Sequence, residues 1–263
     1  MGSDPTGGGH PPTLSSVANA LRVLKSFSSA QRDWGVSDLA RHLHLGKSTV
    51  HRLLTTLVEE RMLEQDIYSG RYRLGLAVFD LAAAVPTQLD LHEAVLSPMT
   101  DLRNASGETV QVAVLDGREV VYVERLDSPH TLRMFLEIGR RNHAHSTATG
   151  KCLMAFLPKA QLDRLLKGWE LPPVTPYTLT DHRRLREDLD AIRYRGYAEN
   201  RHETDLGAVS VAAPIRGANG EVMAALSVAG PEERVDSVRL NLAHATMQTA
   251  ALISRRLGYR GAA

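Results

Sequence analysis

The sequence predicts an α+β protein of two domains, in which an N-terminal winged helix-turn-helix precedes an antiparallel sheet covered by helices. Between residues 16 and 57, apolar residues recur at helical spacing, and a short hairpin pattern follows. After residue 91, two strong hairpin signals stand among amphipathic helices in runs, which is typical of α+β folds. The chain has 263 residues, 43% of them hydrophobic, which is enough for two domains with separate cores.

Three helices are expected in the N-terminal domain. Residues 16–27 form the first and residues 36–43 a short second, and the pattern resumes over 47–59 after a break of one turn. Two helices separated by a few residues, the second with a polar face, are the layout of a helix-turn-helix. The expected inward contacts are Leu39, Ala40, Leu43, Leu45, Val50 and Leu53. His44 occupies the turn position where glycine is usual, because that residue often takes a left-handed conformation.

The third expected helix contains the sequence LGKSTVHRLLTTL, residues 45–57, with one apolar and one polar face. On the polar face, Arg52 suits a bidentate contact with guanine. Lys47 and Ser48 stand at the helix N-terminus, where free N–H groups favour a phosphate. His51 is expected to make no base contact. The other groove-facing candidates are Thr49 and Thr55, with Thr56 as the alternative to Thr55.

A hairpin is expected directly after this helix, from MLEQD and RYRLG joined by a turn at Ser69 and Gly70. A hairpin in this place is a wing. Arg71 and Arg73 lie on its return strand, where they are expected to reach a phosphate or the minor groove. The alternative, that they are ordinary solvated strand residues, stays open.

Residues 74–85, LGLAVFDLAAAV, predict a mostly apolar helix that ends before Pro86 and needs a partner. We expect this linker helix to form a contact between two copies of the chain. The expected divisions are a disordered arm over 1–12, the winged helix-turn-helix over 13–75, the linker helix over 76–90 and the second domain over 91–260.

In the second domain, residues 108–127 predict a hairpin with a type I′ turn at Asp116 and Gly117. Residues 207–231 predict another through Ala218, Asn219 and Gly220. The expected helices cover 91–106, 145–157, 158–168, 181–196 and a long terminal segment from about 232 to 257.

No catalytic constellation is expected. The TATGKC segment resembles a phosphate loop, but His145 and Cys152 stand where that motif requires glycine and a hydroxyl residue. The sequence has neither a GxSxG elbow nor a GxGxxG loop in the right context, so no cofactor is expected. Cys152 is expected to be a small packing residue. His143 and His145 could hold a metal with His182, His202 or Glu203, but the spacing fixes no third ligand, and partly exposed imidazoles are the preferred interpretation.

Composition indicates a cytoplasmic protein without a membrane partner. The single cysteine excludes an intrachain disulfide, and the segment MGSDPTGGGHPP has no apolar stretch of the kind a signal peptide needs. The longest apolar run is interrupted by Asp80 and is too short for a bilayer. The net charge of +1 does not by itself indicate a nucleic-acid partner.

Five segments together resemble the isocitrate-lyase-regulator (IclR) family of bacterial transcription factors, and the resemblance covers about residues 13–258. The segments are LGKSTVHRLLTTL, RYRLG, HSTATGKCLMAFL, GYAENRHETDLGAVSVAAPI and MAALSVAGP. Two departures are His44 for the usual glycine and Cys152 for the more frequent alanine. The resemblance implies a linker helix, an effector domain similar to the GAF fold, and assembly as a homodimer or homotetramer. It also implies a regulator, more often a repressor than an activator, that binds double-stranded operator DNA under the control of a small organic or aromatic acid.

The effector site is expected at the hydroxyl-rich start of the helix after residue 145. N–H groups at Ala148, Thr149 and Gly150 would cradle a carboxylate, and Gly150 would let a ligand approach the backbone. Ser210 and Ser227, on facing strands, can add hydroxyl groups, although satisfied strand hydroxyls are the alternative.

The resemblance places the family's effector site on the same segments and adds Met134, Asn200 and Ala229 to it. Alanine at 229, where some members have serine, suggests a bulkier or more apolar acid. The main alternative function is a small-molecule sensor or enzyme whose N-terminal unit contacts proteins.

Overall fold

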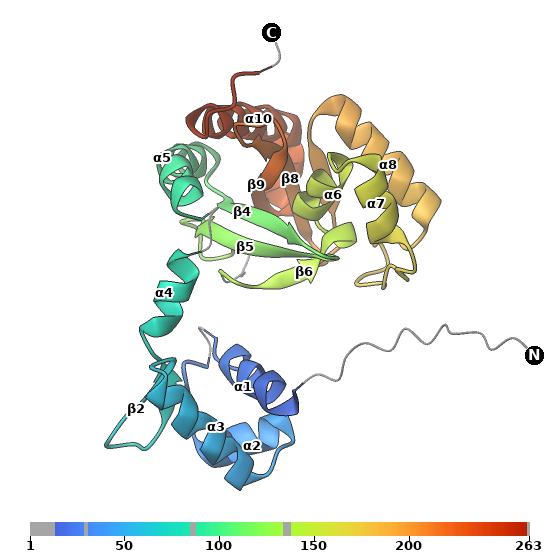
Figure 1. Ribbon diagram of the computed structural model, residues 1–263. Helices are drawn as coiled ribbons and strands as arrows, with labels where there is room; N and C mark the ends of the chain where they lie inside the picture. The colour runs from blue at the N-terminus through green and yellow to red at the C-terminus, as the bar shows by residue number, and fades with distance from the viewer. Residues whose placement is uncertain (1–13, 29–30, 85–87, 134–137, 262–263) are drawn as a thin grey trace, which may run out of the picture. The chain divides into compact units, whose positions relative to one another are not determined.

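A computed structural model of the protein describes residues 14–28, 31–84, 88–133 and 138–261. The chain divides into two compact units, Met1–Pro86 and Thr87–Ala263 (Figure 1). The first unit carries helices and a small sheet, and the second carries a larger sheet with helices on both faces. The α+β class predicted from the sequence is confirmed.

The first unit is a helix-turn-helix followed by a hairpin. Its helices are α1 (Ser15–Lys25), α2 (Val36–Leu43), α3 (Lys47–Glu59) and α4 (Ala77–Ala83). Its strands are β1 (Asp33–Trp34), β2 (Leu63–Gln65) and β3 (Tyr72–Leu74), in the order β1-β3-β2. The bounds of α2 and α3 agree with the prediction, whereas the two-residue strand β1 was not predicted. Helix α4 lies within the expected linker, but Pro86 is outside the described residues, so the domain boundaries stay a prediction.

His44 takes the left-handed conformation that the motif requires, with φ 53° and ψ 45°. In the turn that follows, the Leu45 N–H donates to the Ala40 carbonyl oxygen at 3.0 Å, which closes the end of α2. The core of the unit gathers around fully buried Leu39, Val50 and Leu54. Local sequence therefore determines this unit through the left-handed residues His44 and Arg61 and a small apolar cluster.

The second unit is built on a six-stranded antiparallel sheet in the order β6-β5-β4-β9-β8-β7. Its strands are β4 (Thr109–Asp116), β5 (Glu119–Leu126), β6 (Arg141–His143), β7 (Ala198–Arg201), β8 (Ala208–Arg216) and β9 (Val222–Pro231). Its helices are α5 (Gln88–Ser106), α6 (Ala148–Ala155), α7 (Lys159–Leu166), α8 (His182–Arg195), α9 (Glu232–Val235) and α10 (Arg239–Arg256), with 3₁₀ turns η1 (Ala144–Ser146) and η2 (Asp236–Val238).

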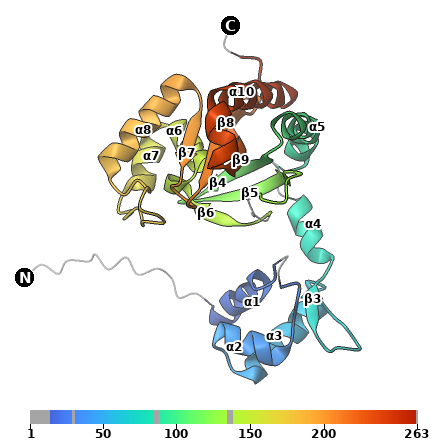
Figure 2. The ribbon, with the colours of Figure 1, turned by 180° about the vertical axis from the view of Figure 1, so that it is seen from behind.

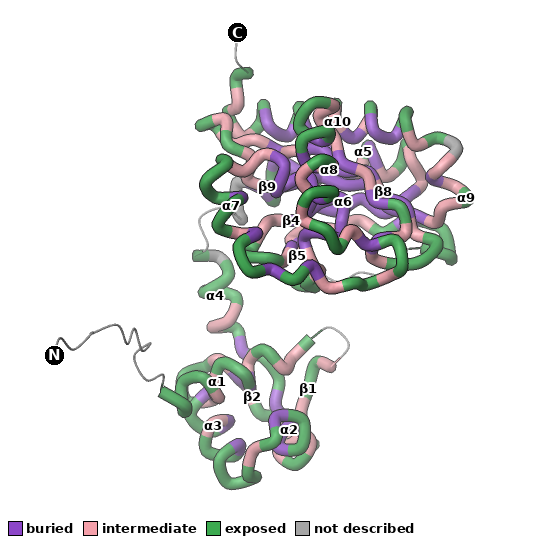
Figure 3. Tube along the Cα trace, turned by 90° about the vertical axis from the view of Figure 1, so that its right-hand side faces the viewer, coloured by how far each residue is buried: buried purple, intermediate pink, exposed green. Residues whose placement is uncertain are grey.

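Helices cover both faces of this sheet (Figure 2). Strand residues alternate between the two sides, so that Val112 and Leu226 pack with α5 and α10, whereas Ala113 and Ala225 pack with α6, α7 and α8. Every residue of α6 is buried, and Figure 3 shows this helix inside the unit. The N-terminus of α6 is therefore buried inside the unit.

Two predictions for this unit were wrong in detail. The first hairpin turns through Gly117 and Arg118, between paired Asp116 and Glu119, and of these two turn residues only Gly117 has positive φ. This is the pattern of a type II′ turn, not of the type I′ turn predicted. The expected single terminal helix is interrupted by η2, so that α9 and α10 are separate helices.

Candidate functional site

Helix α3 presents a polar face to solvent. The buried side of this helix carries Val50, Leu54 and Leu57. The exposed residues are Lys47, Ser48, Thr49, His51, Arg52, Thr55 and Thr56. The N-cap residue Gly46 supplies no side-chain cap, so the first N–H groups of α3 stay available to an anion. Within the described residues, the Arg52 guanidinium has no carboxylate partner. This face combines uncapped N–H groups with an unpaired guanidinium.

The wing arginines, in contrast, are paired with carboxylates. The Arg71 Nε donates to Asp33, and its Nη1 lies 3.8 Å from Asp38 on α2. The Arg73 guanidinium donates to Glu64 on the neighbouring strand at 2.9 and 3.1 Å. Arg71 therefore fixes the wing to the rest of the unit, and one edge of Arg73 is already occupied.

The tip of the wing presents two apolar side chains that are not among the residues predicted to bind DNA. Ile67 is 85% exposed and Tyr68 is 92% exposed. The Asp66 carboxylate accepts hydrogen bonds from the N–H groups of Ser69 at 2.7 Å and Tyr68 at 3.1 Å. The bonds from the Ser69 backbone and hydroxyl lower the pKa of Asp66. The tip is therefore an ordered turn that displays two large apolar side chains.

A small pocket lies in the second unit between the N-terminus of α6 and the sheet. Its lining residues are Gln111, Tyr122, Asn142, Thr147, Ala148, Thr149, Asn200, Thr204, Asp205, Ala208, Ser210, Ser227 and Ala229. The free space between them is about 30 Å³, which is enough to hold a water molecule. The structure thus brings together six of the expected effector residues, namely Ala148, Thr149, Asn200, Ser210, Ser227 and Ala229. Met134 lies outside the described residues.

Gly150 does not line this pocket, and its expected role needs correction. Its N–H donates to the hydroxyl of the N-cap residue Thr147 at 3.0 Å and is not available to a ligand. A Cβ at this position would lie 2.2 Å from the Ala144 carbonyl oxygen. Glycine is required here because η1 passes against α6, not because a ligand approaches. The N–H groups of Ala148 and Thr149 have no intrahelical acceptor, so they remain free to bind an anion.

Two buried polar atoms of the pocket, Ser227 Oγ and Gln111 Oε1, have no hydrogen-bond partner among the described residues, and their residues are 1% and 3% exposed. The hydroxyl of Thr149, which is 2% exposed, contacts the Tyr122 phenol. A buried polar atom without a partner costs roughly 1 to 3 kcal/mol, so such atoms call for a ligand or water. Ser227 is therefore not the satisfied strand hydroxyl of the alternative interpretation.

Tyr122 on β5 adds a phenol to the same wall. Burial raises the pKa of Tyr122, while the side chains of Thr149 and Asn142 partly lower it. The phenol is therefore protonated near neutral pH and can donate to a ligand oxygen. Gln111 and Tyr122 were missed, although two signals existed. Gln111 interrupts an apolar strand, and Tyr122 shares its strand face with Val120, which packs beside α6.

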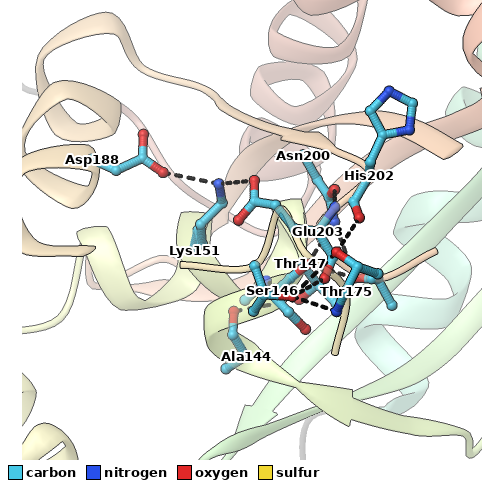
Figure 4. Close-up of polar contacts among 12 residues, drawn as sticks. Ala144, Ser146, Thr147, Lys151, Thr175, Asp188, Asn200, His202 and Glu203 are labelled. Atoms are coloured by element: carbon cyan, nitrogen blue, oxygen red, sulfur yellow. Dashed lines mark hydrogen bonds and ion pairs between the residues drawn. The ribbon is translucent and has the colours of Figure 1, made fainter. Parts of the chain in front are cut away.

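A polar network behind the pocket holds its walls in place (Figure 4). The Lys151 ammonium on α6 contacts Glu203 at 2.6 Å and Asp188 of α8 at 2.9 Å. The Glu203 N–H donates to Asn200 Oδ1 at 3.0 Å, and the Asn200 amide donates to the Ser146 carbonyl oxygen at 2.6 Å. Burial raises the pKa of Glu203, and the Lys151 charge acts against that rise. The network ties Asn200 and Glu203 to η1 and α6.

The described histidines that were considered for a metal site have separate hydrogen-bonding partners. His145 is fully buried, so the expected partly exposed imidazole was wrong for this residue, and its Nε2–H donates to the Pro172 carbonyl oxygen at 3.0 Å. Burial lowers the pKa of His145 to about 4. His182 bonds to the Trp169 carbonyl oxygen, and His202 pairs with Glu232. Among the residues that the structure describes, no three His, Cys, Asp or Glu side chains lie close enough to hold a metal ion together.

Cys152 is fully buried in the core around α6, and burial raises the pKa of its thiol. This environment agrees with the packing role predicted from the sequence. None of the described helices has the length and apolar character needed to span a bilayer.

Comparison with known proteins decides the family. A family profile described as "Bacterial transcriptional regulator IclR C-terminal" matches residues 83–255, and one described as "IclR helix-turn-helix domain" matches residues 16–66. The chain belongs to the IclR family of bacterial transcriptional regulators. It is therefore a DNA-binding regulator with an effector-binding C-terminal domain, and the resemblance seen in its sequence is confirmed.

Relatives of this IclR-family regulator align along nearly their whole length. The HTH-type transcriptional regulator XynR of Escherichia coli is 34% identical over 249 residues, which cover 94% of this chain and 99% of XynR. The regulator KdgR of the same organism is 34% identical over 250 residues, 95% of each chain. A crystal structure of an IclR homolog from Microbacterium hydrocarbonoxydans, complexed with 4-hydroxybenzoate, is 29% identical with a TM-score of 0.82. The match covers 92% of this chain and 98% of that one.

Proposed function

We propose that this IclR-family protein is a repressor that binds operator DNA through α3, with an affinity set by a small carboxylic acid in the α6 pocket. The observation that carries the proposal is the pocket itself, where unpartnered buried polar atoms meet the free N–H groups of an enclosed helix N-terminus. A folded protein retains such atoms where a ligand or a bound water molecule supplies their partners. A relative supports repression rather than activation: the transcriptional repressor AllR of Escherichia coli is 31% identical to this chain.

The proposed DNA contacts follow from the exposed face of α3. Arg52 reads a guanine, Thr49 and Thr55 face the groove, and Lys47 and Ser48 bind phosphate at the helix N-terminus. Arg73 reaches a phosphate with its free edge, and Arg71 positions the wing. The exposed tip residue Tyr68 lies against the sugar–phosphate backbone.

Substitution of Arg52 tests this interface. Arg52→Ala should weaken binding to the cognate site by about 1 to 3 kcal/mol and relax base preference at one position, because a bidentate contact is lost. Gel-shift titration with single-base operator variants measures both effects. Arg183→Ala, which removes an exposed arginine from α8 in the second unit, is the matched control and should leave affinity unchanged. Equal operator affinity of Arg52→Ala and wild type would remove Arg52 from the interface.

The effector is proposed to bind with its carboxylate at the N–H groups of Ala148 and Thr149. The homologous structure with bound 4-hydroxybenzoate supports a carboxylic acid as the chemical class. A thermal-shift screen of small organic acids tests this, since a ligand of the folded state raises the melting temperature by mass action. A screen in which no acid raises the melting temperature would contradict the effector proposal.

A homodimer or homotetramer is proposed because one winged helix reads too few bases to select a site, so half-sites about one helical turn apart are expected. Helix α4 and the residue before it expose Leu76 (74%), Phe79 (73%) and Leu81 (59%), apolar area that a second copy would cover. Sedimentation at micromolar concentration should show a dimer or tetramer, and Phe79→Ser should weaken it. A wild-type monomer would contradict the proposal. We place this regulator in the cytoplasm, where its DNA partner resides.

A further inference from the structure

We propose that Ile67, at the tip of the wing, is an apolar wedge that enters the minor groove of the operator at a base step and bends the duplex there. This inference rests on the proposed DNA contacts of α3 and the wing. It goes beyond them because it adds a deformation of the DNA, and with it a way of selecting sequence that needs no hydrogen bond to a base. Tyr68 keeps its proposed place against the sugar–phosphate backbone beside the wedge.

The exposure of Ile67 is the first argument. At 85% exposed, it is the most exposed aliphatic side chain in the described part of the chain. Its loop neighbours Asp66, Ser69 and Gly70 are residue types that turns prefer, whereas isoleucine is not. Burial of an isoleucine side chain is equivalent to a factor of roughly 10 to 150 in a binding constant, and the fold does not use it here. A partner that covers this side chain gains that factor.

The second argument is that the tip is held in shape, as a wedge must be. Besides the two N–H groups described above, the Asp66 carboxylate accepts from the Ser69 hydroxyl at 2.8 Å. The Gly70 N–H donates to the Asp66 carbonyl oxygen at 2.9 Å, and the Asp66 N–H donates to that of Arg71 at 2.8 Å. Arg71 in turn is paired with Asp33 on β1. An ordered tip loses little conformational freedom when it enters a groove, so the gain from apolar burial is largely kept.

The third argument identifies the partner as the duplex. The loop between β2 and β3 projects from the first unit in Figures 1 and 2, and its hairpin directly follows α3 in the chain. A stable protein interface buries about 1,200 to 2,000 Å² in total, far more than the two side chains of the tip offer. DNA that is already bound by α3 needs no such area at the tip. Apolar side chains that insert between base pairs from the minor groove kink the duplex by roughly 20 to 90°.

A wedge selects DNA by its deformability. Insertion of Ile67 separates two stacked base pairs, and pyrimidine–purine steps such as TA and CA are the ones that unstack most easily. The operator should therefore carry such a step under each wing. The energy of unstacking offsets most of the gain from burying the isoleucine. The wedge accordingly has a large effect on the shape of the DNA and a small one on the overall affinity.

A circular-permutation gel shift of the full chain on DNA from upstream of its own gene measures the bend. Wild type should bend this DNA by about 20 to 90° per wing. Potassium permanganate, which oxidises unstacked thymines, should react more strongly at the step under the wing. Ile67→Ser should lower the bend angle by at least about half and abolish the added reactivity, while affinity falls by no more than about tenfold. Ile67→Leu, which keeps a wedge, should behave like wild type.

Two comparisons complete the test. Ile138→Ser removes an exposed isoleucine of the second unit, 62% exposed, and is the matched control with no expected change in bend or affinity. Exchange of the reactive pyrimidine–purine step for AA should weaken wild-type binding about fivefold or more, since a stiff step resists the kink. The same exchange should leave the affinity of Ile67→Ser nearly unchanged, because this variant does not unstack the step.

The outcomes separate the wedge from the function it rests on. Tight, selective binding by wild type without a bend, or an unchanged bend in Ile67→Ser, would overturn the wedge and leave the α3 interface in place. Equal weakening of both proteins by the step exchange would indicate a base contact elsewhere and would also overturn it. An unchanged bend together with a smaller oligomer of Ile67→Ser in sedimentation would assign the tip to a contact between copies. Failure of wild type to prefer the upstream DNA over a random duplex would overturn the proposed function, and the wedge with it.

Discussion

Removal of the Lys151 ammonium should destabilise the second unit strongly. The Lys151 side chain is 3% exposed and lies within 3 Å of Glu203 and Asp188, whose side chains are 10% and 24% exposed. In Lys151→Met, Glu203 loses its ion-pair partner, and Asp188 keeps the Arg195 guanidinium at 3.8 Å. Breaking a buried pair in this way costs about 3 to 5 kcal/mol. For a unit of this size, that cost corresponds to a fall in melting temperature of roughly 6 to 20 °C.

Urea unfolding of the full chain, followed by circular dichroism at pH 7 and pH 5, measures the effect. The loss should be smaller at pH 5, because Glu203, whose pKa is already raised by burial, takes up a proton once Lys151 is absent. Combination with Glu203→Gln should restore part of the stability, so the double variant should lose at least about 1 kcal/mol less than the sum of the single ones. Additive losses, or a loss that does not change with pH, would refute the coupling inferred from the geometry.

Three further changes test the pocket and its support. Gly150→Ala places a Cβ 2.2 Å from the Ala144 carbonyl oxygen, which forces α6 to shift at a cost of about 1 to 3 kcal/mol. The melting temperature should therefore fall by roughly 2 to 12 °C. An unchanged melting temperature would contradict this reason for the glycine. Thr147→Val removes the helix cap and should lower the free energy of unfolding by about 0.5 to 2 kcal/mol, as measured by urea unfolding. Effector binding, measured by calorimetry, should also become weaker. An unchanged free energy of unfolding and an unchanged effector affinity would show that the cap is dispensable. His145 is neutral in the folded state, where its pKa is about 4, whereas the unfolded chain binds the proton below about pH 6.5. The free energy of unfolding of the wild type should therefore fall by on the order of 3 kcal/mol as the pH falls from 6.5 towards 4. His145→Gln should flatten that pH profile of the melting temperature, and an equally steep profile would contradict the assignment.

The first unit could be predicted in detail because its signals are local. The left-handed His44, the apolar spacing of α2 and α3, and the turn at Gly70 depend on residues close together in the chain. The ion pairs of the wing could not be predicted in this way. Asp33 and Arg71 are 38 residues apart, and only the pairing of β1 with β3 brings them together.

The pocket was predictable from the hydroxyl-rich start of α6 and from the serines of β8 and β9. Gln111 appears in the sequence as a polar residue within an apolar strand, but only the strand register places it at the pocket. Asp205 was missed because its inclusion depends on the course of a loop. The role of Gly150 was wrong for a similar reason, since the sequence shows a flexible residue but not the neighbouring η1 backbone. Contacts of this kind arise only when distant segments pack.

Fluorescence anisotropy tests the two-domain mechanism most directly. The purified protein is titrated onto DNA from upstream of its own gene at physiological salt, with and without the acid that raises its melting temperature most. We expect clear preference for this DNA over a random duplex and a roughly 5- to 150-fold change in affinity on addition of the acid. Equal affinity for both duplexes, in the presence and in the absence of the acid, would contradict the mechanism.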